Sequence, residues 1–174
     1  MVFASMNKIP WIAFALALLF AILYFSNTVS SLPPMVASHF DGAGFPTTFM
    51  TRAFYTKFVF AMGVGFPIVM VALLSWVYSK AGDMKLPNRD YWLAPERIGQ
   101  TRALLVSHAV WFGCLMVVMV CYMHWLELVA HRNVPPRLSN QLVMGGLLVF
   151  MGIAIGWVIG LLRTFRRPSS LSAR

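Results

Sequence analysis

Residues 104–125 read LLVSHAVWFGCLMVVMVCYMHW and contain no Asp, Glu, Lys or Arg. A helix needs about 20 mostly apolar residues to cross the hydrocarbon core of a bilayer, and this stretch is long enough. Three further uncharged apolar runs lie at residues 10–27, 58–78 and 142–162. The sequence therefore predicts an all-α integral membrane protein, in which residues 1–174 form a single domain of four transmembrane helices.

The composition of the whole chain agrees with this fold class. Of its 174 residues, 59% are hydrophobic and 11% are charged, which leaves too little polar surface for a water-soluble globule and too few charges for a disordered chain. The net charge of +9 would indicate nucleic-acid binding if the basic side chains formed one exposed face. They flank the apolar runs instead, so the lipid bilayer is the predicted environment and no nucleic acid is expected to bind.

The first apolar run also has features of a signal peptide, because Lys8 precedes it and Ser30 and Ser31 follow it. It is long for the apolar region of a signal peptide and is not followed by a clear A-x-A cleavage site. A retained first helix is therefore the favoured interpretation.

The basic residues are unevenly divided between the two ends of the predicted helices. If all four helices are retained, most of the 14 Lys and Arg residues share a side with the two termini. The side opposite the termini holds only Arg52, Lys57, Arg132 and Arg137. Because positive residues accumulate in cytoplasmic segments, both termini and the middle connection are predicted to be cytoplasmic.

The fourth apolar run carries a glycine repeat. Gly152, Gly156 and Gly160 are spaced by four residues, which places them on one face of a helix and allows a second helix to approach closely. The neighbour is either another helix of the same bundle or a partner chain, including a second copy. The spacing alone leaves both alternatives open.

The connections at residues 32–57 and 86–97 do not have the composition of simple linkers. Both combine turn-forming Pro, Gly or Asn with several aromatic residues, and aromatic rings need a surface on which to be buried. Both connections are therefore predicted to be ordered, and the first is predicted to fold back onto the membrane surface.

These two connections carry motifs that resemble one bacterial family. A Leu-Pro start at Leu32 is followed by His-Phe-Asp-x-x-Gly-x-Pro at residues 39–46 and by Leu-Pro-Asn-x-Asp-Tyr-Trp-Leu-Ala-Pro-Glu at residues 86–96. The chain over about residues 32–102 resembles the N-terminal domain of unknown function of SdpI-type immunity and signalling membrane proteins. The resemblance implies a non-enzymatic protein of the bacterial cytoplasmic (inner) membrane. The implied site residues are His39, Asp41, Gly44 and Pro46 in the first connection, and Pro87, Tyr91, Trp92, Pro95 and Glu96 in the second.

Histidines and acids gather on the side that carries few basic residues. His124, Glu127 and His131 stand at i, i+3 and i+7, a spacing that aligns them along one helix face. With His39 and Asp41 they could supply imidazole and carboxylate ligands to Zn²⁺ or Cu²⁺. The structural alternative is that these side chains reach towards water or bond to backbone carbonyls.

His108 lies inside the third apolar run, where an unpartnered imidazole is costly. Ser107, Arg102 or a facing carbonyl could form a hydrogen bond with this imidazole. The functional alternative is axial ligation of a haem or a chlorophyll-type pigment. The sequence shows no nucleophile arrangement, no phosphate-binding glycine loop and no pair of intramembrane acids, so no enzymatic activity is expected.

Three functions follow from these features. The leading hypothesis is a non-enzymatic binding or regulatory protein whose segment from His39 to Pro46 recognises an extracytoplasmic ligand, such as a peptide. The first alternative is an accessory subunit packed into a larger membrane complex, or into a homo-oligomer, by the glycine face of the fourth helix. The second alternative is a Zn- or Cu-binding protein at the outer surface.

Overall fold

The computed structural model describes residues 7–80 and 86–166. Four of its helical segments are long and apolar enough to cross a membrane: Ile9–Ser31, Arg52–Ser79, Ile98–Ala130 and Asn140–Arg166. This confirms four long apolar helices at the predicted positions. Each helical segment extends beyond the predicted apolar run, because a helix continues through the headgroup layer where polar residues are tolerated.

The first span is helix α1 (Ile9–Thr28), which ends in the short helical turn η1 (Val29–Ser31). The second consists of α2 (Arg52–Phe60), a π-helical turn η2 (Ala61–Gly65) and α3 (Phe66–Ser79). Pro67 lacks the backbone N–H that a regular helix needs, which is consistent with irregular geometry at this point. Gly63 is buried in the turn against the ring of Phe25, where a larger residue would collide with that ring.

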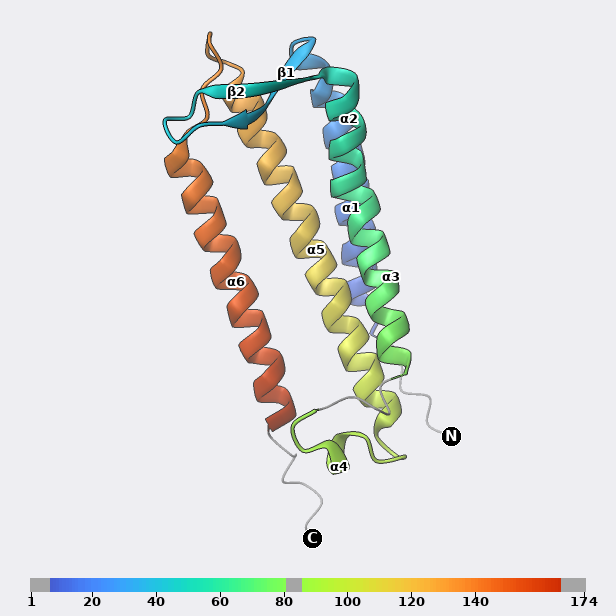
Figure 1. The fold of residues 1–174 in the computed structure, drawn as a ribbon. Helices are drawn as coiled ribbons and strands as arrows, with labels where there is room; N and C mark the ends of the chain where they lie inside the picture. The colour runs from blue at the N-terminus through green and yellow to red at the C-terminus, as the bar shows by residue number, and fades with distance from the viewer. Residues whose placement is uncertain (1–6, 81–85, 167–174) are drawn as a thin grey trace.

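Helices α1, α3 and α5 (Ile98–Ala130) pack together as one unit (Figure 1). Close approach between α3 and α5 depends on Gly113, whose backbone lies against Val71 and Phe14. The core of this unit consists of buried apolar side chains, which include Phe14, Ala21, Phe25, Val59, Val71, Val110 and Val117.

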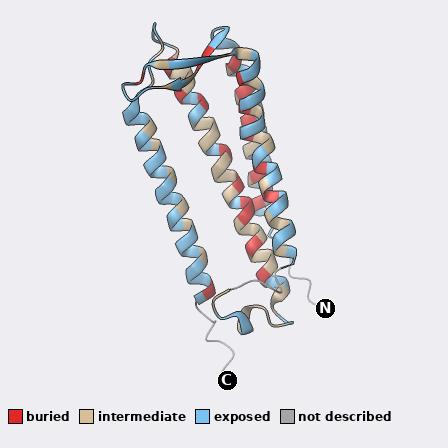
Figure 2. Ribbon diagram, in the orientation of Figure 1, coloured by how far each residue is buried: buried red, intermediate tan, exposed pale blue. Residues whose placement is uncertain are grey.

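Helix α6 (Asn140–Arg166) stands apart from that unit. It is exposed along most of its length (Figure 2), and no residue in its most apolar window is buried. Its contacts with the rest of the chain are concentrated at its two ends and at the ring of Trp157, which meets His108 and Phe112 on α5.

The connection between α1 and α2 contains an antiparallel β-hairpin, formed by β1 (Met35–Phe40) and β2 (Pro46–Thr51). The all-α prediction missed this hairpin. The register runs from Met35 opposite Thr51 to Phe40 opposite Pro46. An isolated two-stranded hairpin is marginally stable in water, so contacts with the helices have to hold it in place.

The two ends of the helices differ in what they carry. The start of α1, the end of α6 and the short helix α4 (Arg89–Trp92) lie at one end, here called the terminal end (Figure 1). The hairpin and the α5–α6 connection lie at the opposite end, here called the hairpin end. The compartment that each end faces stays a prediction. Lys85, Arg167 and Arg174, which belong to the basic residues of the terminal side, lie outside the described residues.

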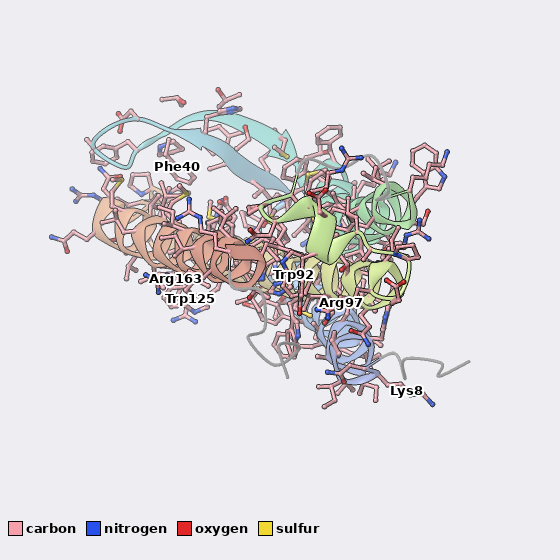
Figure 3. The ribbon with its side chains drawn as sticks, turned by 90° about the horizontal axis from the view of Figure 1, so that it is seen from below. Lys8, Phe40, Trp92, Arg97, Trp125 and Arg163 are labelled. Carbon is pink, nitrogen blue, oxygen red and sulfur yellow. The ribbon has the colours of Figure 1, made fainter. Side chains whose placement is uncertain are left out.

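At the terminal end, the segment before α5 holds the last turn of α6 (Figure 3). The Trp92 indole donates to the carbonyl of Phe165 over 2.9 Å. Asn88, with a left-handed φ of 53°, donates its side-chain amide to the carbonyls of Phe165 and Arg166. The last carbonyls of a helix have no partner within the helix, so these bonds cap α6 and fix its end.

Candidate functional site

His131 links the hairpin to α5. Its Nε2 accepts the backbone N–H of Ala37 over 3.1 Å. A nitrogen that accepts carries no proton, so the ring is neutral with its proton on Nδ1. Nδ1 lies 2.9 Å from the carbonyl oxygen of Glu127 and 3.3 Å from Oε1 of the same residue. Nδ1–H of His131 therefore donates to the backbone carbonyl of Glu127, and the Glu127 carboxyl lies beside the ring beneath strand β1.

His124, two turns earlier on α5, is 1% exposed and joins three helical segments. Its Nδ1 lies 2.8 Å from the hydroxyl of Tyr55 on α2, and its Nε2 lies 2.8 Å from Oγ1 of Thr28 on α1. Thr28 donates its own proton to the carbonyl of Tyr24. Nε2–H of His124 is therefore the donor to Thr28, and the Tyr55 hydroxyl donates to Nδ1.

The predicted metal ligands are not gathered into one site. Both ring nitrogens of His124 are engaged in hydrogen bonds, and Nε2 of His131 is occupied by the amide of Ala37. His39 lies exposed on β1, with its Nδ1 3.3 Å from the Ser38 hydroxyl. Within residues 7–80 and 86–166, no group of three His, Cys, Asp or Glu side chains could hold a metal ion. The structure therefore gives no support to the predicted Zn or Cu site.

Asp41 and Gly44 build the turn of the hairpin. Oδ1 of Asp41 accepts the backbone N–H groups of Ala43 and Phe45, each over 2.9 Å. Gly44 has a φ of 84°, and a side chain there would collide with the carbonyl of Leu138. Only glycine fits such a position without strain. These two motif residues therefore shape the hairpin tip, and Pro46 lies opposite Phe40 where β2 begins.

The hairpin tip docks on the α5–α6 connection. Leu138 donates its backbone N–H to the carbonyl of Gly44 over 2.9 Å, and the side-chain amide of Asn140 donates to the carbonyl of Gly42. The guanidinium of Arg137 lies over the ring of Phe45, 5.0 Å from its centroid. The hairpin therefore bridges the first helical unit and the start of α6.

The exposed surface of the hairpin is more apolar than is usual for a segment outside the membrane. The side chains of Met35, Phe45 and Phe49 are each exposed by 40–50%, and His39 and Thr47 are exposed beside them. Of the four ligand-binding residues expected from the motif, His39 lies opposite Thr48 in the strand register, and its exposed side chain has no role in the turn.

The residues of the second motif lie at the terminal end. Pro87 precedes the left-handed Asn88, and Trp92 caps α6. The ring of Tyr91 lies under the guanidinium of Arg97, with 3.7 Å between the guanidinium carbon and the ring centroid. Pro95 and Glu96 lie in the turn that leads into α5. This motif therefore joins the last turn of α6 to the first turn of α5.

His108 packs edge-on against Trp157, with 5.3 Å between the ring centroids. The Nδ1 atom of His108 and the indole nitrogen of Trp157 are buried, and neither has a hydrogen-bond partner among the described residues. The expected partners Ser107 and Arg102 are not used by Nδ1. A haem or pigment ligand at His108 stays a prediction.

The glycine face of α6 is free of neighbours. An added side chain at Gly152, Gly156 or Gly160 would meet no described atom within 4 Å. Gly146 is different, because its backbone lies against the ring of Tyr122. The structure therefore does not use the predicted glycine repeat for packing within the described chain.

Sequence reasoning missed the partners of the buried His124. Tyr55 and Thr28 lie at the ends of apolar runs, where an aromatic ring or a hydroxyl is expected at the headgroup layer in any case. The only available signal was the position of His124 inside a span, where an imidazole needs a partner.

Comparison with protein-family profiles, curated proteins and solved structures finds no match to this chain.

Proposed function

We propose that this chain is a non-enzymatic, multi-pass protein of the bacterial inner membrane that recognises an extracytoplasmic peptide with its hairpin. The distribution of Lys and Arg supports cytoplasmic termini, which would expose the hairpin end to the outside. The motif resemblance to SdpI-type immunity and signalling proteins supports a regulatory role.

The hydrogen bond between Ala37 and His131 is the observation that carries the proposal. Strand β1 is the strand that would contact a ligand. The hydrogen bond joins it directly to α5, the longest helix of the bundle. Two turns away, His124 connects α5 to α1 and α2 through Thr28 and Tyr55. A displacement of β1 on binding would therefore be transmitted to three helical segments through hydrogen bonds that exist in the free protein.

The hairpin has two features that suit an extended peptide. A two-stranded sheet leaves backbone groups unpaired along its edges, and such an edge can pair with an added strand. The exposed rings of Phe45 and Phe49 lie along the same hairpin and offer apolar contacts for alternate side chains of the peptide. His39 adds one titratable polar group to this surface.

The proposal is tested by panning a phage-displayed library of random peptides on the full chain in lipid nanodiscs. Enriched peptides should bind the wild-type protein and lose binding to a His39→Ala, Phe49→Ala double variant. A Thr47→Ala variant, which changes an exposed side chain of the same strand without removing a ring, should bind as the wild type does. Failure to enrich any peptide above empty nanodiscs, or equal binding to the double variant, would overturn the proposal.

A role as an accessory subunit is the second candidate, because Gly152, Gly156 and Gly160 have no neighbour in the described chain. Native gel electrophoresis of membranes solubilised in mild detergent tests it. The 19.5 kDa chain should migrate within a larger complex that Gly156→Leu disrupts. Gly99→Leu, which also places a side chain in open space but on α5, should leave the complex intact. Migration as a monomer would remove this candidate.

A further inference from the structure

A chamber of about 340 Å³ lies between α5 and α6 in the half of the molecule towards the hairpin end. Its walls include Leu115, Val118 and Met119 from α5, and Gly145, Val149 and Ile153 from α6. This volume is within the roughly 300–1,000 Å³ of small-molecule binding sites. An apolar chamber of this size does not retain water readily and suits an apolar occupant.

Contacts between α5 and α6 flank the chamber, which is partly open along its side. Towards the hairpin end, the hydroxyl of Tyr122 donates to the carbonyl of Leu142 over 2.7 Å. Towards the terminal end, the rings of Phe112 and Trp157 meet with 5.3 Å between their centroids. These two contacts set the spacing of α5 and α6 around the chamber, and its open side leaves room for a molecule to pass the Tyr122–Leu142 bond.

From Gly145 to Ile153 the chamber extends about 12 Å along α6, at 1.5 Å per residue. A narrow, flexible hydrocarbon chain fits such a space, and the bilayer around the two helices supplies one.

A polar depression lies at the start of α6, about one helical turn beyond the chamber. It is lined by Ala43, by Asn133 and by the segment from Arg137 to Gln141, with no acidic residue among its lining residues. Gln141 stands one turn before Gly145 on the same face of α6, so the depression and the chamber follow one another along the helix. A molecule that reaches from one into the other needs a polar head and an apolar tail.

Arg137 gives this depression a positive charge. Its guanidinium carbon lies over the ring of Phe45, 5.0 Å from the ring centroid. Its side chain forms no hydrogen bond or ion pair with the rest of the described chain. Guanidinium edges match the oxygen atoms of a phosphate group.

We propose that the space between α5 and α6 is a binding site for an anionic phospholipid, with one acyl chain in the chamber and the phosphate at Arg137. The site needs no peptide ligand, so it stands apart from recognition at the hairpin. The lipid fills the space that α6 leaves open and stabilises the separated position of this helix.

Native mass spectrometry of the full chain released from detergent micelles tests this proposal, with phosphatidylglycerol and phosphatidylcholine of identical acyl chains as probes. The wild type should retain phosphatidylglycerol in preference to phosphatidylcholine. Arg137→Gln should weaken phosphatidylglycerol binding about tenfold, the loss expected for a charge-assisted hydrogen bond, and should abolish the preference. Arg132→Gln, which removes an exposed arginine of the same connection that does not line the depression, should behave as the wild type.

Substitutions that fill the chamber test the site of the acyl chain. Gly145→Phe places a ring where an added side chain meets no other atom within 4 Å, and it should remove binding of both lipids. Val118→Phe fills the chamber from α5 and provides the same test if the first variant fails to fold. Gly152→Leu, on α6 but outside the chamber, should bind as the wild type does.

Three results would overturn the proposal. They are equal retention of the two lipids by the wild type, unchanged binding in both chamber-filling variants, and a second protein chain bound in place of lipid. The last result would assign the space beside α6 to a protein partner.

Discussion

The backbone N–H of Ala37 donates to Nε2 of His131 over 3.1 Å, and both residues are almost fully enclosed. They are separated by 94 positions in the sequence, so this bond ties a strand of the hairpin to the far end of α5. It defines the protonation state of His131 and makes the hairpin part of the helical structure.

Removal of the imidazole should destabilise the attachment of the hairpin. His131→Ala leaves the buried amide of Ala37 without an acceptor, which costs about 1–3 kcal/mol. Unfolding by denaturing detergent, followed by circular dichroism, measures the change in unfolding free energy. His39→Ala is the control, because that side chain is exposed on the same hairpin. Equal stability of the two variants would show that the bond contributes nothing.

The pair formed by His124 and Tyr55 should show a measurable coupling energy. Tyr55→Phe removes one hydroxyl and should cost about 1 kcal/mol of unfolding free energy. His124→Leu leaves the buried Tyr55 hydroxyl without a hydrogen-bond partner and should cost about 2–3 kcal/mol. In the His124→Leu background the Tyr55→Phe change should cost nothing, because its partner is already gone. Additive losses in this double-mutant cycle would contradict the assigned hydrogen bond.

The hairpin tip should tolerate a side chain at one glycine and not at the other. Gly44→Ala introduces a Cβ at positive φ and against the carbonyl of Leu138, and should cost about 1–3 kcal/mol. Gly42→Ala meets no atom within 4 Å and should be close to neutral. Limited proteolysis of the hairpin reports the difference, and the prediction fails if both variants are cut at the wild-type rate.

The cap on α6 should determine how firmly its last turn is held. Trp92→Phe keeps a ring against Phe165 but removes the indole donor to its carbonyl. We expect faster amide hydrogen exchange in the last turn of α6 and unchanged exchange in the middle of α1. Trp76→Phe, which changes an exposed indole on α3, is the matched control. Unaltered exchange in the last turn of α6 would argue against the cap.

The helices were predictable from sequence, and the contacts between them were not. Runs such as residues 104–125 are uncharged and long, so the cost of placing charges in hydrocarbon identifies them without reference to any other part of the chain. The hairpin was missed because its strands are short and its burial pattern does not alternate strictly: Val36 and Ala37 are both buried on β1. Local periodicity therefore gives no clear strand signal there.

In the candidate site, too, the helix face was predictable from sequence and the contacts between segments were not. Sequence spacing identified His124, Glu127 and His131 as one helix face, but it left a metal site and a structural role both open because their partners lie on other segments. Tyr55 and Thr28 become neighbours of His124 only after three helices have packed. The separation of α6 from the other helices could not be predicted either, since a glycine repeat has the same spacing whether it faces the bundle or a partner.

Extracytoplasmic recognition by the hairpin requires the hairpin end to lie outside the cell. Single cysteines at Thr47, Asn133 and Asp90, in a chain whose native Cys114 and Cys121 are replaced by alanine, can be labelled with a membrane-impermeant maleimide. In intact cells Thr47→Cys and Asn133→Cys should react, whereas Asp90→Cys should react only in inverted membrane vesicles. Labelling of Asp90→Cys in intact cells, with Thr47→Cys and Asn133→Cys protected, would place the hairpin in the cytoplasm and contradict extracytoplasmic recognition.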